Sequence, residues 1–221
     1  MRIRVPPQLT PKEAIQLQLR LAPFVQAAGG LPRDLAAIVG CDATYIDRKT
    51  VAAAVSVDPD DLSVRRVRFI EASTTFPYIP GLLAFREAGA VLRAVRALRQ
   101  SSYVCLVDGH GLAHPRRCGL ACFVGLALDR PTIGVAKSLL CGTVRGNQVV
   151  DEDGRVTAEV MTLPDNGKTI YVSVGHRISL HNAAQLVRRC LTPQGPSPLR
   201  LAHAEVTKRK WQIKRSSQAS S

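Results

Sequence analysis

The sequence predicts one domain of the α/β class, built on a mixed five-stranded sheet with helices on both faces. Three consecutive strand-like segments with short links come first, and that order is typical of an antiparallel meander. Strand-like and helix-like segments then alternate, which indicates parallel strands. The 221 residues, 46% of them hydrophobic, are enough for one sizeable core.

The first helix is expected to begin after Thr10 and to run to about Ala28. Thr10 is a suitable N-cap, Pro11 stands at the first helical position, and Glu13 follows three residues after the cap. The glycine pair at 29–30 then ends the helix.

The remaining elements follow from runs of strand formers and from apolar residues at helical spacing. Strands are expected at 36–46, 49–58, 63–74, 103–107, 131–136, 148–154, 155–163 and 168–175, and helices at 80–99, 115–128 and 180–191. We assign residues 1–207 to the single domain and residues 208–221 to a basic tail that is expected to fray.

The charge of the chain points to a polyanionic partner. It has 30 Lys and Arg against 17 Asp and Glu, a formal net charge of +13, and such an excess most often serves nucleic-acid binding. The alternative is a ribosome-associated or merely soluble basic protein. Lys12, Glu13 and Arg20 interrupt any N-terminal signal sequence, and no window approaches the ~20 apolar residues of a membrane span. We therefore expect a cytoplasmic protein that does not bind membranes.

The cysteines suit a reduced core better than disulfides or a zinc site. The six are Cys41, Cys105, Cys118, Cys122, Cys141 and Cys190, mostly in apolar surroundings. Four zinc-type ligands, His110, His114, Cys118 and Cys122, do recur every four residues. However, glycines and a proline break the helix between them, and four ligands along one straight helix cannot surround an ion. Cys118 and Cys122 are expected to face the core.

Three carboxylates stand where a core residue would be expected. Asp42 lies inside an apolar strand, Glu87 lies on the apolar stripe of its helix, and Asp108 ends another apolar strand. Each has a structural alternative: a strand end facing water or an ion pair, a buried cation partner, and a helix N-cap, respectively. Together, from separate elements, they make a plausible oxygen-rich Mg²⁺ site. In a protein that binds nucleic acid, such a site favours metal-assisted phosphodiester hydrolysis.

Five segments resemble the endonuclease V family, the deoxyinosine-directed repair nucleases. They read VGCDATY, FPYIPGLLAFREAG, LVDGHGLAHPRRCGLA, IGVAKSLLCG and YVSVGHRISL, and they span residues 39–180 in the order of the family. The resemblance implies a ribonuclease H-like fold, which agrees with the strand order above. It also implies Mg²⁺-dependent hydrolysis, with Mn²⁺ as a substitute, of the second phosphodiester 3′ to hypoxanthine in DNA.

The resemblance also assigns site residues. Asp42, Glu87 and Asp108 match the metal-binding carboxylates, and His203 stands where relatives carry a further Asp or His near the metals. The lesion-binding positions are Tyr78, Ile79, Pro80, Gly81, Leu83, Gly109, Gly111 and Leu140. The resemblance implies that the stretch Tyr78–Gly81 is the wedge that enters the duplex. An aromatic ring and a proline are suited to this role, because they can replace lost base stacking. Its alternative is a buried hydrophobic staple.

Two further residues are candidate catalytic groups. Lys137 follows a strand and is expected at the same sheet edge as Asp108, where a lysine could bind the scissile phosphate. His114 could contact the phosphate or assist proton transfer. The alternatives are a solvated loop lysine and a capping histidine. The basic C-terminal stretch from Lys208 to Arg215 either contacts a nucleic-acid backbone or is a solvated tail.

The competing functions are an inosine-directed RNA endonuclease, a non-catalytic basic nucleic-acid-binding protein, and another ribonuclease H-like enzyme such as a junction resolvase. The buried carboxylates argue against a pure binder, because they would repel phosphate. The YIPG stretch at 78–81 argues against a resolvase. We expect a monomer.

Overall fold

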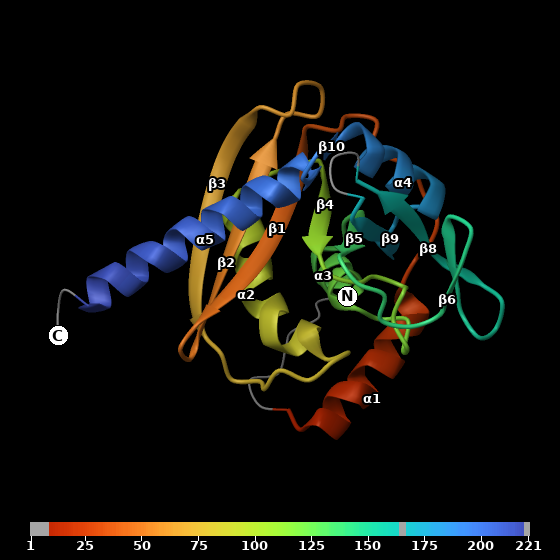
Figure 1. Cartoon of the computed structure of the whole chain (residues 1–221), viewed down its shortest axis with the longest axis horizontal. Coiled ribbons are helices and arrows are strands. Elements are labelled where there is room, and N and C mark those ends of the chain that lie inside the picture. The colour runs from red at the N-terminus through yellow and green to blue at the C-terminus, as the bar shows by residue number, and fades with distance from the viewer. Residues whose placement is uncertain (1–8, 164–166, 219–221) are drawn as a thin grey trace.

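A mixed sheet of nine strands forms the centre of the fold, in the order β3-β2-β1-β4-β5-β9-β8-β7-β6 (Figure 1). The computed structural model describes residues 9–163 and 167–218. Within these residues, no helix has both the length and the apolar character that crossing a membrane requires.

The first five of the predicted strands form one half of this sheet. β1 (Ala37–Ile46), β2 (Lys49–Val57) and β3 (Val64–Ser73) make the antiparallel meander. β4 (Tyr103–Asp108) pairs in parallel with β1, and β5 (Thr132–Ala136) pairs in parallel with β4. The predicted α/β class and the mixed, ribonuclease H-like strand order are therefore confirmed.

Four further strands make the sheet wider than the five strands predicted. β9 (Thr169–His176) pairs antiparallel with β5, and β8 (Val156–Thr162) pairs with β9. The short strands β7 (Gln148–Val150) and β6 (Thr143–Arg145) follow. The sequence indicated three of these segments as strands but not their place, because pairing of β5 with β9 joins residues more than thirty positions apart.

Helices cover both faces of the sheet, as predicted. α2 (Leu83–Ala97) and α3 (Leu120–Leu128) contact each other and the sheet, whereas α5 (Ser197–Gln218) crosses β1 and β2 on the opposite face (Figure 1). α4 (Leu180–Arg189) packs against β8 and β9. A separate two-stranded ribbon, β10 (Leu191–Thr192) with β11 (Gly195–Pro196), precedes α5.

The first helix is shorter than predicted. Its capping box is present, since the Thr10 hydroxyl accepts from the Glu13 amide and the Glu13 carboxylate accepts from the Thr10 amide. However, α1 covers only Pro11–Leu21 and passes into a 3₁₀ turn at Ala22–Phe24. Pro23 within that turn has no N–H to donate, so the α-helical hydrogen bonding cannot continue.

The helix predicted from Pro115 begins only at Leu120. Arg117 has a left-handed backbone (φ 50°), which interrupts any helix at that point. The Gly119 amide instead donates to the Gly111 carbonyl at 3.1 Å. The residues between Asp108 and Leu120 therefore form an irregular loop that folds back on itself.

The C-terminal segment is helical where fraying was predicted. α5 continues to Gln218, so the boundary proposed at residue 207 falls inside a helix, and residues 219–221 lie outside the described residues. Arg209 donates to Glu71 of β3 through Nε (3.2 Å) and Nη2 (2.9 Å), which ties this end of the helix to the sheet.

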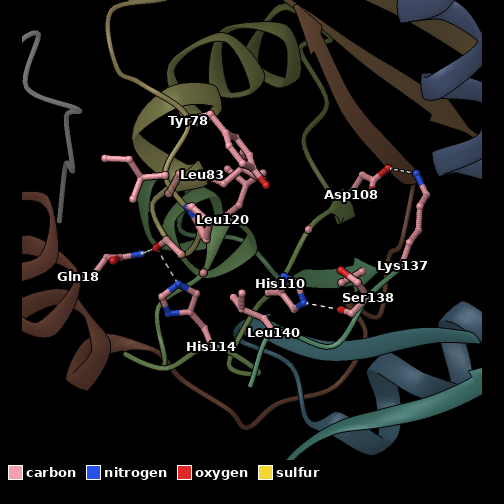
Figure 2. Close-up of a pocket in the computed structure, with 17 residues that line it drawn as sticks. Gln18, Tyr78, Leu83, Asp108, His110, His114, Leu120, Lys137, Ser138 and Leu140 are labelled. Carbon is pink, nitrogen blue, oxygen red and sulfur yellow. Dashed lines mark hydrogen bonds and ion pairs between the residues drawn. The ribbon is translucent and has the colours of Figure 1, made fainter. Parts of the chain in front are cut away.

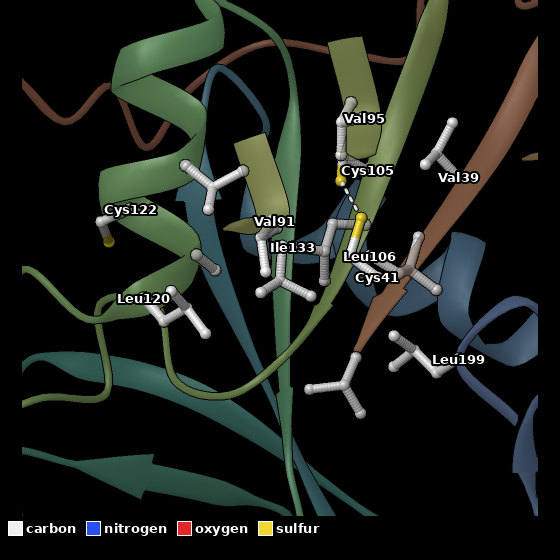
Figure 3. Packing of buried hydrophobic residues seen from close by; sticks show 14 of the residues in the cluster. Val39, Cys41, Val91, Val95, Cys105, Leu106, Leu120, Cys122, Ile133 and Leu199 are labelled. Atoms are coloured by element: carbon white, nitrogen blue, oxygen red, sulfur yellow. Dashed lines mark hydrogen bonds between the residues drawn. The ribbon is translucent and has the colours of Figure 1, made fainter. Parts of the chain in front are cut away.

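The core lies between the sheet and its helices, and it contains most of the cysteines (Figure 3). Cys41, Cys105, Cys118, Cys122 and Cys190 are buried, Cys141 is half-buried, and all six are free thiols. The Sγ atoms of Cys41 and Cys105 are 3.3 Å apart (Figure 3). The prediction that Cys118 and Cys122 face the core is confirmed.

A glycine in β1 allows α5 to approach the sheet closely. A Cβ atom on Gly40 would lie 2.0 Å from the carbonyl oxygen of Pro198, at the start of α5. Since any side chain here would displace the helix, this contact fixes where α5 crosses β1. It also fixes the position of His203, which lies on α5.

Candidate active site

The ends of two neighbouring parallel strands bring two carboxylates together. In the register of β1 and β4, Cys41 is opposite Val107, so Asp42 and Asp108 follow at adjacent positions. Asp42 is 9% exposed, and its charge interacts with that of Asp108. The strand pairing itself therefore positions these two carboxylates.

Side chains alternate along β1 between the two helical layers. Gly40 and Asp42 face α5, where Asp42 Oδ2 is 2.7 Å from Nδ1 of His203. Tyr45, at odd spacing from them, faces α2 and donates its hydroxyl to Oε1 of Glu87. This strand thus binds one candidate group from each face of the sheet.

Glu87 is the most perturbed of the three carboxylates. It is 7% exposed, and burial together with the charges of Asp42 and Asp108 raises its pKa to about 8, against the opposing hydrogen bond from Tyr45. Burial, and next the charge of Asp108, also raise the pKa of Asp42, although its hydrogen bond with His203 opposes the shift. The three acids therefore repel one another in a setting with little water.

Lys137 is at the sheet edge predicted for it. Its Nζ lies 2.5 Å from Oδ2 of Asp108, and its side chain is 68% exposed. Burial alone would lower the pKa of Lys137, but the charge of Asp108 and the hydrogen bond to it raise the pKa above the usual value. A cation that stands partly in solvent beside a carboxylate is available to a phosphate group.

The donor set suits a divalent cation in its chemistry. All three acids offer oxygen ligands of the kind that Mg²⁺ prefers, and a cation would offset the repulsion that raises the pKa of Glu87. As the side chains stand, Asp42, Glu87 and Asp108 are engaged with His203, Tyr45 and Lys137, respectively. Among residues 9–163 and 167–218, no three His, Cys, Asp or Glu side chains are arranged so that they could hold a metal ion without moving. This also applies to the four zinc-type ligands His110, His114, Cys118 and Cys122.

A cavity of about 260 Å³ opens beside these acids, and we call it the loop-side cavity (Figure 2). Asp108 and Lys137 lie at one end of it, and Tyr78 and Leu83 lie at the other (Figure 2). The predicted site residues that line it are Tyr78, Ile79, Pro80, Gly81, Leu83, Asp108, Gly109, His114, Lys137 and Leu140. Tyr78 is 68% exposed, which excludes a buried staple.

Three side chains hold the Tyr78–Gly81 loop by one atom, the carbonyl oxygen of Gly81. Gln18 Nε2 donates to it at 3.0 Å, and His114 Nε2 and Arg116 Nη2 each donate at 2.8 Å. Arg116 Nε also donates to Gln18 Oε1 at 2.7 Å. We call Gln18, His114 and Arg116 the Gly81 clamp.

The hydrogen bonds of His114 define its protonation state. Nε2 donates to Gly81 O, whereas Nδ1 accepts from the Arg116 amide at 3.1 Å, so the ring is neutral with its proton on Nε2. Burial lowers the pKa of His114 to about 4, and the charge of Arg116 acts in the same direction. Both ring nitrogens are therefore occupied in supporting the loop.

Four of the predicted site residues lie outside the loop-side cavity. Asp42 and Glu87 do not line it, and His203 lines a different cavity, which also includes Asp108. Gly111 does not line it either, because it packs against β9: a Cβ on Gly111 would lie 2.1 Å from Val174 O. Gly111 is therefore required for close packing against β9, whereas Gly109 lines the cavity.

Sequence reasoning missed several residues of this site. Gln18 is fully buried in the middle of α1, and a polar residue on an apolar helical face was the available signal. Tyr45 follows Asp42 by three positions, and the Arg86 guanidinium lies 4.1 Å from the centre of its ring. His110 Nε2 lies 2.9 Å from Ser138 O, which links the two walls of the cavity.

Comparison with known proteins agrees with this geometry. The family model described as Endonuclease V matches residues 20–204. The endonuclease V of Thermofilum pendens is 38% identical over 211 residues, which cover 92% of this chain and 90% of that one.

Solved structures give the same result. The endonuclease V of Streptomyces avermitilis superposes with a TM-score of 0.87 at 31% identity, over 96% of this chain and 98% of that one. The endonuclease V of Ciona intestinalis, solved with a 24-mer DNA containing an inosine followed by a ribo-adenosine, gives a TM-score of 0.83 at 26% identity, over 90% and 96% of the two chains. In sequence and in fold, therefore, this nuclease belongs to the endonuclease V family.

Proposed function

We propose that this chain is a divalent-metal-dependent endonuclease that recognises hypoxanthine in DNA and hydrolyses the second phosphodiester on its 3′ side. One observation supports this most directly: Asp108 and Lys137 stand at the end of the loop-side cavity, opposite Tyr78. A base held in that cavity would place its own strand against the carboxylates. The inosine-containing DNA bound by the Ciona relative supports the same substrate class.

The residues of the site have separate roles in this proposal. Tyr78, exposed at the tip of a clamped loop, stacks in the gap that an extruded base leaves. Lys137 binds a non-bridging oxygen of the scissile phosphate and neutralises charge that develops there. Asp42, Glu87 and Asp108 would hold Mg²⁺ or Mn²⁺, and His203 orients Asp42 through its hydrogen bond. The cation would supply Lewis acidity for water activation and leaving-group stabilisation.

The carboxylate cluster also favours this proposal over the alternative of a non-catalytic, basic nucleic-acid-binding protein. Burial already disfavours the charged forms of Asp42 and Glu87, and the carboxylates add repulsion towards phosphate. A protein that only bound nucleic acid would gain affinity by losing them. Their presence beside Lys137 is explained by hydrolysis.

A nicking assay tests the proposal. Matched duplexes with one inosine or one guanine, and matched RNA strands, are incubated with Mg²⁺, and product lengths are mapped. We expect one cut, two phosphodiesters 3′ to inosine, in DNA and none in the undamaged duplex. A cut at equal rate without inosine would refute lesion recognition, and a preference for the RNA strand would assign RNA as the substrate.

A further inference from the structure

A second cavity adjoins the first one at the carboxylates. It has a volume of about 570 Å³, and Asp108 and Lys137 line both cavities. Its other walls come from Val135 of β5, from Leu163 and Lys168 between β8 and β9, from the start of β9, from the β10–β11 ribbon and from the start of α5. None of these residues lines the loop-side cavity. We call it the α5-side cavity. The scissile phosphate proposed above therefore has a cavity on each side.

The α5-side cavity carries the chemistry of a nucleotide subsite. Leu163, Ile170 and Leu199 are each at most 7% exposed and supply an apolar wall. Lys168 and Arg200 supply cationic groups at the exposed end. Its volume lies within the roughly 300–1,000 Å³ that is usual for small-ligand sites.

The charges favour a phosphate in this cavity. Asp108 is its one acidic lining residue, and Lys137 already pairs with Asp108. Within the part of the chain that the structure describes, Arg200 forms no ion pair with a carboxylate. A guanidinium of this kind matches the geometry of a phosphate group.

We infer that the α5-side cavity binds the nucleotide immediately 3′ to the scissile phosphate, with its base against the apolar wall and its 3′ phosphate on Arg200. This rests on the proposed function, which places the lesion base in the loop-side cavity and the cut at Asp108. The strand then continues past Lys137 into the cavity that adjoins this residue on the other side. The enzyme thus binds the strand on both sides of the scissile phosphate.

Binding of two inosine strands by Arg200→Gln tests the inference. One strand ends in a 3′-hydroxyl at the nucleotide after the cut, and the other continues for ten more nucleotides. Both are annealed to the same complement, and affinity is measured by anisotropy in EDTA. On the long strand, we expect about tenfold weaker binding and a log–log salt slope shallower by about 0.9, the share of one phosphate. On the short strand, we expect no change.

Two variants make the test specific. Arg200→Lys keeps the charge and is expected to retain the salt slope, whereas Arg93→Gln, an exposed arginine on α2, is expected to bind both strands like the wild type. An equal loss on both strands, or no loss on either, would overturn the subsite. Failure of the proposed function is distinguishable, because the wild type would then show no preference for inosine over guanine in either strand.

The base is tested separately from the phosphate. An abasic site at the nucleotide after the cut removes contact with Leu163, Ile170 and Leu199 and is expected to weaken wild-type binding. The same abasic site one nucleotide further along is the control and is expected to have a smaller effect. Equal effects at both positions would refute the assignment of the apolar wall to the base.

Discussion

Two regions of the site, the carboxylates at the sheet edge and the Tyr78–Gly81 loop, are positioned by different forces. Asp42 and Asp108 follow from the register of two buried parallel strands, whose hydrogen bonds involve only backbone atoms. The loop is held through one carbonyl oxygen by the Gly81 clamp. Backbone pairing does not depend on which side chains are present, whereas each hydrogen bond of the clamp depends on one particular side chain. The comparison predicts that chemistry and recognition can be altered separately.

The largest expected effect is at the carboxylates. Asp108→Asn removes a proposed metal ligand, and losing several kcal/mol of charge stabilisation lowers the rate by about 10³-fold. Single-turnover nicking of inosine duplex in Mg²⁺ measures this. Affinity for the duplex in EDTA should be unchanged or higher, because a negative charge near phosphate is lost. The exposed Asp60→Asn is the control, and retained nicking by Asp108→Asn would contradict the site.

The second effect is on the pH dependence of stability. Burial raises the pKa of Glu87 to about 8, so between its ordinary value of 4.5 and about 8 the folded protein holds a proton that the unfolded chain has lost. The free energy of unfolding of the metal-free protein should therefore fall as pH rises through this window, by on the order of a few kcal/mol.

Urea titrations from pH 5 to pH 9 in EDTA measure this slope. Glu87→Gln keeps an acceptor for the Tyr45 hydroxyl and should flatten it. Added Mg²⁺ should stabilise the wild type more at pH 8.5 than at pH 5.5, because the cation favours the ionised acids. A slope that Glu87→Gln leaves intact would show that another group titrates.

The third effect should be confined to recognition. Tyr78→Ala removes stacking worth about 1–3 kcal/mol on duplex DNA, where an extruded base leaves a gap. Single-stranded inosine DNA has less stacking to replace and should lose less. Nicking of both substrates over a Mg²⁺ titration measures the difference. An equal loss on both substrates, or a shifted Mg²⁺ requirement, would show that Tyr78 supports the metal site, and recognition and chemistry would then not be separable.

The smallest effect is at the clamp. His114→Phe keeps the ring, and Gly81 O keeps its donors Gln18 and Arg116, so the free energy of unfolding should fall by about 0.5–1.5 kcal/mol, the net value of a hydrogen bond. Thermal denaturation and single-turnover nicking at saturating substrate are compared. A rate loss of about 10²-fold or more would identify His114 as a proton-transfer group and not a support for the loop.

The sequence by itself determined the fold class and the elements on which Asp42, Glu87 and Asp108 lie. Two local patterns predicted these acids: strand formers precede Asp42 and Asp108, and an apolar stripe surrounds Glu87. Both patterns report which residues are buried, so they can be interpreted from the sequence alone. The same patterns placed the core cysteines correctly. They misplaced the ends of α1 and α3, because Pro23 and the left-handed Arg117 act through backbone geometry that hydrophobic spacing does not report.

Only the tertiary structure decided how the acids and the loop are held. Gln18 reaches Gly81 across 63 positions, Arg116 reaches Gln18 across 98, and His203 reaches Asp42 across 161. No local pattern encodes such contacts, because each depends on how closely two packed elements approach, as Gly40 permits for α5. The α5-side cavity has the same origin. Residues from five strands and helices line it, namely β4, β5, β9, β11 and α5, and no local sequence pattern shows that these elements meet.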